Sequence, residues 1–294
     1  MKLARFIHNN SLSYGAIEDQ NVVSLPNLAF QLQERLPPTL EEFVAQDQTA
    51  LATAETLLAR AKAEGLAKFS VSLSEAQLLA PVSSPPKIVL LGWNYFDHTA
   101  ERKVDTPEEP VFFMKPHTAI IGPGDKILKR PFVTQLDYEG ELALVIGKKC
   151  KDVSAEQAAD CIFGYTILND VSARNFQFKD KQWTRGKGFD TFAPTGPCIT
   201  TRSQMPETSS VGIKTWVNDE LRQNGSTRDM IFSVAQIIYH LSRVMTLEPC
   251  DIISTGTPSG VAMAMKEPKW LKNGDVVRIE VEGIGTLENT VQEA

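Results

Sequence analysis

Three carboxylates occur at every second position in the segment QLDYEGELALVIG, residues 135–147. If this segment forms a strand, Asp137, Glu139 and Glu141 project from one face, because side chains alternate along a strand. The Cα atoms of Glu139 and Glu141 are then about 7 Å apart, so both side chains can reach a common cation. The segment contains no lysine or arginine that would neutralise them. The pattern indicates a cation site, and a solvent-exposed edge strand is the alternative explanation.

A further carboxylate stands where the apolar segment GYTIL runs into Asn169 and Asp170. Taken alone, Asp170 is better explained as the cap of the turn that follows. Together with Glu139 and Glu141 it completes a set of oxygen ligands, which hard divalent cations such as Mg²⁺ and Mn²⁺ prefer. We therefore expect Glu139, Glu141 and Asp170 to bind Mg²⁺ or Mn²⁺.

A histidine and a glutamate, His98 and Glu101, are three positions apart in the segment GWNYFDHTAE. A short helix that begins at Asn94 or Asp97 would place both side chains on one face. The carboxylate would then fix the imidazole tautomer and raise its basicity, as the activation of a water molecule at neutral pH requires. The spacing alone leaves a solvated helix face as an equal alternative.

The composition is that of a globular protein that acts on small molecules. The chain has 294 residues, of which 42% are hydrophobic, so it can bury a sizeable core. A net charge of -6 disfavours a nucleic-acid partner. No apolar run approaches the roughly 20 residues of a membrane span, and the first residues lack the pattern of a secretory signal. We therefore expect a cytoplasmic protein without a nucleic-acid or membrane partner.

The chain changes character at APVSSPPK, residues 80–87, where prolines and serines interrupt any regular element. Residues 1–80 combine short strands with a helical run that ends near Gly65, which predicts a small α/β N-terminal domain. Residues 86–294 contain many short β-type segments and few helices, which predicts a β-rich α+β domain. Two helices are expected within it, over residues 154–164 and 229–245.

Six motifs in the second part resemble, in order, those of the fumarylacetoacetate hydrolase family. They are GWNYFDHTAE, PVFFMKP, DYEGELALVIGK, GYTILNDVSARNFQ, TRGKGFDTFAPTGP and ISTGTPSGV. Six ordered motifs over roughly residues 86–294 are far more specific than one short pattern. The resemblance implies the mixed β-roll of that family, at least a homodimer, an N-terminal domain like that of larger members, and metal ligation by Glu139, Glu141 and Asp170.

The resemblance also implies roles at positions that would otherwise be ordinary turns and surface charges. It makes His98 and Glu101 a catalytic pair on a lid over the substrate, and Lys187 an electrophile for a developing enolate. The substrate-binding positions that it implies are Asn94, Tyr95, Lys115, Arg174, Gln177 and Thr257. One residue departs from the pattern, because Trp93 stands where some hydrolases of the family have an arginine. An aromatic ring cannot neutralise a distal carboxylate, which leaves the reaction open.

Chemistry next to a 2-oxo acid group fits these residues. The first hypothesis is a metal-dependent hydrolase that cleaves a carbon–carbon bond in a 1,3-dicarbonyl 2-oxo acid, of the acylpyruvate or fumarylacetoacetate type, through a metal-bound enolate. The alternative is a 2-oxo acid decarboxylase of the oxaloacetate type, or an isomerase, that uses the same site. A catalytically silent metal-binding dimer is disfavoured, because the full set of catalytic and ligand residues is present. The sequence does not decide between the first two.

Overall fold

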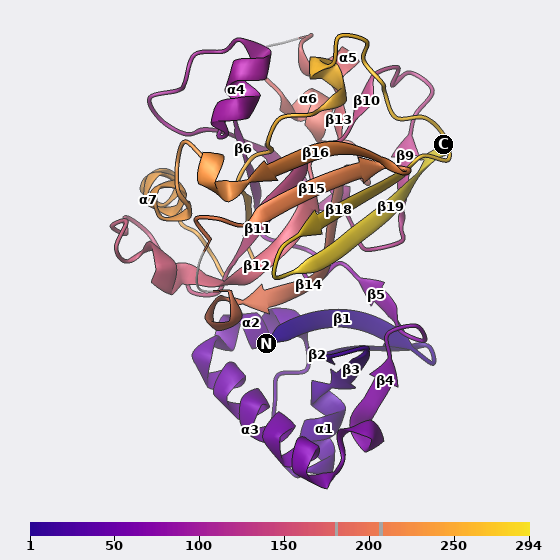
Figure 1. The fold of residues 1–294 in the computed structure, drawn as a ribbon. Helices are drawn as coiled ribbons and strands as arrows, with labels where there is room; N and C mark the ends of the chain where they lie inside the picture. Colours follow the sequence, from indigo (N-terminus) through magenta and orange to yellow (C-terminus); the bar gives the residue numbers. More distant parts are fainter. Residues whose placement is uncertain (180–181, 206–207) are drawn as a thin grey trace.

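The strands of the protein form two main sheets in the computed structural model, which describes residues 1–179, 182–205 and 208–294 (Figure 1). The larger, 12-stranded sheet has the order β4 (Ser70–Ser72), β3 (Asn21–Ser24), β2 (Ser11–Glu18), β1 (Lys2–His8), β14 (Ala193–Thr201), β12 (Ile162–Asn169), β11 (Gly140–Ile146), β17 (Ile252–Ser254), β6 (Ile88–Gly92), β7 (Val111–Lys115). Two further strands join it, β5 (Gln77–Leu79) beside β1 and β8 (Ile120–Ile121) beside β14.

The second sheet has five strands, in the order β16 (Glu220–Ser226), β15 (Gly212–Val217), β18 (Val276–Val281), β19 (Gly285–Glu293), β9 (Lys126–Lys129). A separate pair joins β10 (Leu136–Asp137) and β13 (Ser172–Ala173). The α-helices are α1 (Leu25–Gln31), α2 (Leu40–Gln46), α3 (Gln48–Glu64), α4 (Phe96–Arg102), α5 (Arg174–Gln177), α6 (Thr184–Lys187) and α7 (Val234–Val244). The described part of the chain has no helix long and apolar enough to cross a membrane.

Strand β11 is covered on both faces, which explains the apolar run from Leu142 to its end at Ile146. Leu142 and Leu144 belong to the core that the five-stranded sheet shares, whereas Ala143 and Val145 pack in the core of the N-terminal helices. The expected β-rich α+β architecture is confirmed, with the strand and helix region of the N-terminus beneath it in Figure 1.

The N-terminal strands continue the main sheet, because β1 pairs antiparallel with β14 through Leu3 and Ile199. The segment 80–87, where we placed the domain boundary, carries no helix or strand and leads from β5 into β6. The division into residues 1–80 and 86–294 therefore stays a prediction, and one sheet runs through both parts.

Of the two helices expected in the second part, the one expected over residues 229–245 is present but begins only at Val234, and the other is wrong. Helix α7 begins after Ser233, whose side chain forms a capping box with Gln236. The segment after Ser154 forms only a short 3₁₀ helix, η3 (Ala158–Cys161). The backbone amide of Ser154 does bond to Gln157 at 3.1 Å, but the apolar residues that follow are taken up by the buried strand β12. Tertiary packing overrides the local helix signal there.

Candidate active site

The candidate site lies along the edge of the main sheet that is formed by the ends of its strands, not along an outermost strand. Strand pairing explains why its residues meet there. Strand β11 runs antiparallel to β12, with Gly140 opposite Asn169, so the start of β11 lies beside the end of β12. Strand β17 is antiparallel to β11 and parallel to β6. The carboxyl ends of β12, β17 and β6 therefore share an edge with the start of β11, and Figure 1 shows α4, α5 and α6 grouped at the end of the molecule opposite the N-terminal helices.

The three predicted ligands come together at this edge. Oxygen atoms of Glu139, Glu141 and Asp170 all lie within 4.8 Å of one another, and all three side chains are buried. The backbone amide of Asp170 donates to the carbonyl of Glu139 at 2.9 Å, which fixes the two neighbouring segments. The alternative of an exposed edge strand is wrong, because β11 is an inner strand and Glu141 is 0% exposed.

Cations from other elements neutralise the carboxylates, although the local sequence contains none. Lys187 Nζ, at the end of α6, lies 2.8 Å from Glu139 Oε2 and 2.5 Å from Asp170 Oδ2. Lys115 Nζ, at the end of β7, lies 2.7 Å from Asp170 Oδ1. Arg174 Nη2 donates to Glu139 Oε1 at 2.6 Å, and Arg174 Nε donates to Asp137 Oδ2 at 2.9 Å. Asp137 is thus occupied by Arg174 and does not belong to the ligand set.

Burial and these charges shift the pKa values of the site's titrating groups in opposite directions. Burial, together with Asp170 and Glu139, raises the pKa of Glu141 well above its ordinary value. Burial also tends to raise the pKa of Glu139, but Lys187 and Arg174 outweigh it and lower that pKa. Burial lowers the pKa of Lys115 to about 8 in spite of the attraction of Asp170. Glu141 is therefore the ligand whose negative charge is least compensated by the protein itself.

The free oxygen of Glu141 supports a divalent cation at this site. Its Oε2 accepts hydrogen bonds from the Ser254 hydroxyl and from the backbone amide of Gly256, the latter at 3.1 Å. Its Oε1 is buried and has no hydrogen-bond partner among the described residues. A buried acceptor without a donor is costly, and a cation removes that cost. The residues therefore fit Mg²⁺ or Mn²⁺.

Glu141 gives the metal-free protein a pH dependence with a defined sign. Its pKa is higher in the folded protein than in the unfolded chain, so the unfolded chain loses the proton first and folding stability falls as pH rises above the ordinary Glu pKa. Gln can keep the bonds from Ser254 and Gly256 without the charge. In EDTA, the melting temperature of Glu141→Gln should therefore rise relative to that of wild type as the pH is raised from about 5 to about 8.

Thermal melts at several pH values check this expectation, and an excess of Mn²⁺ provides the control. Mn²⁺ should raise the melting temperature of wild type above that of Glu141→Gln, because only wild type retains all three carboxylates. If the melting temperature of Glu141→Gln does not rise relative to that of wild type as pH rises, Glu141 is ionised without strain in the metal-free fold.

Helix α4 places the predicted catalytic pair in contact. His98 Nδ1 lies 2.8 Å from Glu101 Oε1, and His98 is only 7% exposed, so a solvated helix face is the wrong interpretation. Because the carboxylate accepts, Nδ1 carries the proton and Nε2 is left as the basic nitrogen of the ring. The helix begins at Phe96, between the two starting residues that we expected.

A small cavity of about 30 Å³ is lined by both His98 and Glu139, and aromatic rings form much of its wall. Trp93 stacks on the His98 ring with centroids 5.6 Å apart, and Trp183 meets Trp93 edge-on at 5.7 Å. The cavity is lined by Leu91, Gly92, Trp93, His98, Phe113, Glu139, Arg174, Gln177, Phe178, Trp183, Lys187, Thr257 and Met263. Trp183, Phe113, Phe178 and Met263 were not predicted, because no short-range pattern connects them to the site.

The predicted substrate-binding residues divide into two groups. Arg174, Gln177 and Thr257 line the cavity, as do the catalytic candidates His98 and Lys187. Asn94, Tyr95 and Lys115 are buried and do not line it.

Two of the three buried residues have their polar groups committed to the protein. The Asn94 amide donates to the carbonyl of Thr255 at 2.7 Å and accepts from the amide of Phe232 at 2.8 Å. The Lys115 ammonium faces Asp170 and donates to the carbonyl of Val171 at 2.9 Å. Substrate contacts by Asn94, Tyr95 and Lys115 stay predictions.

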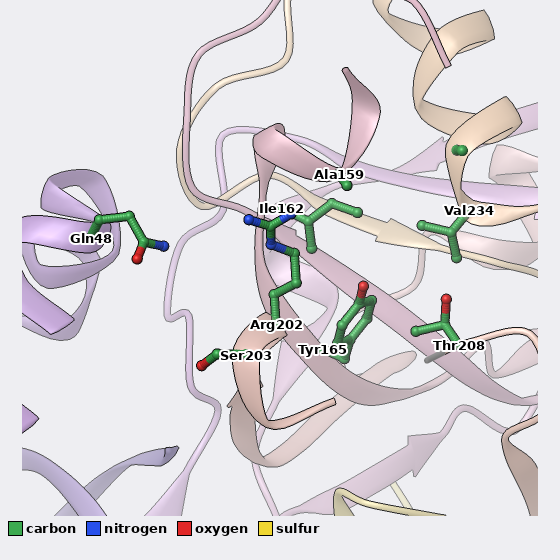
Figure 2. A pocket seen from close by; sticks show the side chains of 9 residues that line it. Gln48, Ala159, Ile162, Tyr165, Arg202, Ser203, Thr208 and Val234 are labelled. Carbon is green, nitrogen blue, oxygen red and sulfur yellow. The ribbon is translucent and has the colours of Figure 1, made fainter. Parts of the chain in front are cut away.

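A second, larger cavity of about 370 Å³ lies away from these residues, between α3, η3 and the start of α7 (Figure 2). Arg202 and Tyr165 project into the region that Figure 2 shows, and Arg202 forms a 3.6 Å ion pair with the exposed Asp160. Exposed ion pairs of this kind contribute little to the stability of the fold. None of the predicted metal ligands or catalytic residues lines this cavity, so we assign the chemistry to the smaller one.

Comparison with known proteins identifies the family. Residues 87–292 match the C-terminal fumarylacetoacetate (FAA) hydrolase family, and the chain belongs to the fumarylacetoacetate hydrolase family. Oxaloacetate tautomerase YisK of Bacillus subtilis (strain 168) is 44% identical over 283 residues, which are 94% of this chain and 94% of that protein.

Two solved structures match the whole chain and confirm the fold. The fumarylacetoacetate hydrolase of Exiguobacterium antarcticum has a TM-score of 0.84 at 36% identity, with 100% of both chains covered. The maleylpyruvate hydrolase of Sphingobium sp. SYK-6, solved in complex with manganese(II) and pyruvate, has a TM-score of 0.79 at 30% identity, again with 100% of both chains covered. Relatives of this chain thus include both tautomerases and hydrolases, and one of them holds Mn²⁺.

Proposed function

We propose that the protein is a 2-oxo acid isomerase that interconverts the keto and enol forms of oxaloacetate. This is the isomerase alternative of the sequence analysis, and the 44% identity to an oxaloacetate tautomerase supports it. The observation that carries the proposal is that His98, whose Nδ1 is held by Glu101, lines one cavity together with Lys187 and Glu139. This arrangement supplies a base and an electrophile for proton transfer between carbon and the 2-oxo oxygen, a reaction that needs no attacking water.

Charge at the site suits a doubly negative substrate. Four buried carboxylates, including Asp137, face three cations, which are Lys115, Lys187 and Arg174. A divalent cation held by Glu139, Glu141 and Asp170 would make the site positive overall, and when bound it would polarise the 2-oxo group as a Lewis acid. Arg174, Gln177 and Thr257 line the same cavity, where they can hold the substrate's carboxylate and carbonyl oxygens.

The protein's own residues supply the proton transfer. His98 Nε2 takes a proton from the carbon next to the 2-oxo group. The electron pair of the broken C–H bond forms the carbon–carbon double bond, and the π pair of the carbonyl moves to the 2-oxo oxygen. The Lys187 ammonium stabilises the charge that develops on that oxygen. His98 then passes the proton that it accepted to the 2-oxo oxygen, which completes the enol and restores the neutral imidazole. Glu101 stabilises the imidazolium while it carries that proton.

Hydrolysis of an acylpyruvate is the second candidate, because the two structural relatives described above are hydrolases. His98 would then deprotonate water instead of carbon. The two functions are separated by offering the Mn²⁺-loaded protein oxaloacetate and acylpyruvates in parallel. Enol absorbance, acid release and CO₂ release report isomerisation, hydrolysis and decarboxylation respectively.

Lys187→Met should lower the rate of keto–enol exchange by about two orders of magnitude or more, the usual cost of removing one donor from a developing oxyanion. Steady-state rates on oxaloacetate measure the effect, and Lys149→Met, at an exposed position, is the matched control. If Lys187→Met keeps turnover within about a factor of ten, the ammonium serves only to balance Glu139 and Asp170.

A further inference from the structure

Helix α4 is fastened at two points to one segment, residues 257–263, which we call the coupling loop. Asp97 Oδ2 accepts hydrogen bonds from the backbone amide and the hydroxyl of Ser259, at 3.0 and 2.6 Å. Glu101 Oε2 accepts from the backbone amide of Gly260 at 3.1 Å. The other oxygen of Asp97 accepts from the backbone amide of His98 at 2.8 Å. A single carboxylate therefore connects the backbone of the base to the loop.

The coupling loop is also bonded to the metal-ligand side of the cavity. The amide of Ala262 donates to Asp137 Oδ1 at 2.9 Å, and Asp137 Oδ2 accepts from Arg174, which donates in turn to Glu139. The hydroxyl of Thr257 donates to the carbonyl of Gly140, between two ligands, at 3.0 Å. The loop thus lies between the base and the carboxylates and is hydrogen-bonded to both.

The path of the loop is fixed by its backbone. Gly260 has a φ of 105°, a conformation that other residues rarely adopt, and a Cβ atom there would lie 2.0 Å from the carbonyl oxygen of Arg222. Glycine is thus required for the close approach to strand β16. This constraint holds the amides of Ser259 and Gly260 where α4 can reach them with Asp97 and Glu101.

We infer that Asp97 is a positioning residue, which sets the distance of His98 from the carboxylate cluster by holding the first turn of α4 on the coupling loop. The inference rests on the proposed role of His98 as the base. Without Asp97, the helix keeps the Glu101 contact but loses the bonds that fix its first turn. A displacement of about 1 Å in a reacting group can cost about 10²-fold in rate. Asp97 itself touches none of the metal ligands.

The test compares Asp97→Ala with Ser259→Ala and with Asp105→Ala, an exposed position beyond the same helix. Asp97→Ala should lower kcat for keto–enol exchange by about 10- to 100-fold with a smaller change in KM. Ser259→Ala should lower kcat less than Asp97→Ala does, because the Asp97 carboxylate keeps its bonds to the backbone amides of residue 259 and His98. It should have no further effect in the Asp97→Ala background. Asp105→Ala should match wild type.

Two readouts do not depend on turnover. Hydrogen exchange of residues 96–102 should accelerate in Asp97→Ala, while the affinity for Mn²⁺, measured by titration, should equal that of wild type. An unchanged kcat of Asp97→Ala, or unchanged hydrogen exchange in its helix α4, would overturn the inference. A loss of Mn²⁺ affinity that accompanies the loss of kcat would also overturn it. If wild type does not isomerise oxaloacetate, the proposed function fails. The hydrogen-exchange data then still test whether Asp97 holds the first turn of α4 on the coupling loop.

Discussion

Protein freed of divalent cations by EDTA should have no measurable activity on oxaloacetate, and Mg²⁺ or Mn²⁺ should restore it. The physical reason is the buried cluster of Glu139, Glu141 and Asp170, in which Glu141 Oε1 has no donor among the described residues. Three lysine and arginine side chains balance the cluster, but none of them hydrogen-bonds to Glu141 in the described structure. A cation lost from the site would remove the Lewis acid that activates the 2-oxo group.

Rates on oxaloacetate before and after chelation, with metal content measured on the same samples, test this expectation. Glu141→Gln should behave as chelated wild type does, and added Mn²⁺ should not rescue it. Full activity in protein shown to be free of metal would contradict the account of the site.

The second large effect is expected at His98. His98→Ala should lower keto–enol exchange by about 10²–10⁴-fold, the range for loss of a general base. Affinity for Mn²⁺ should be retained, because His98 belongs to α4 and is not a member of the carboxylate cluster. His117→Ala, at an exposed position, is the matched control.

The same variant separates two roles of His98. Decarboxylation of oxaloacetate, if wild type shows any, requires no proton removal from carbon and should fall less than exchange does. Steady-state rates of both reactions in wild type and His98→Ala measure the split. Equal proportional losses would show that His98 serves a shared step, such as closure of α4 or substrate binding.

The sequence was sufficient for the parts of the site that short spacings encode. Glu139 and Glu141 are two positions apart, and Asp170 ends an apolar strand, so their meeting at one sheet edge could be predicted from strand geometry and the family motifs. The contact between His98 and Glu101 could be predicted equally well, because side chains three positions apart in a helix lie next to each other. Gly65 marked the end of α3, which the structure confirms.

Other parts of the site depend on contacts between distant segments, which no local pattern encodes. Lys187 reaches back 48 positions to Glu139, and Asp97 bonds to Ser259 across 162 positions. Trp93, noted in the sequence only because it replaces an arginine, stacks on His98 in the structure. The helix expected after Ser154 failed for the converse reason, since the demands of the sheet outweigh a local capping signal.

The central claim is that this protein moves a proton on a four-carbon 2-oxo acid without adding water. The most direct measurement follows enol absorbance of oxaloacetate with Mn²⁺-loaded wild type, while the total amount of oxaloacetate is assayed in the same sample. We predict that the approach to keto–enol equilibrium accelerates while total oxaloacetate stays constant, and that acylpyruvates offered in parallel release no acid at a comparable rate. Unchanged equilibration together with rapid acid release from an acylpyruvate would contradict the account.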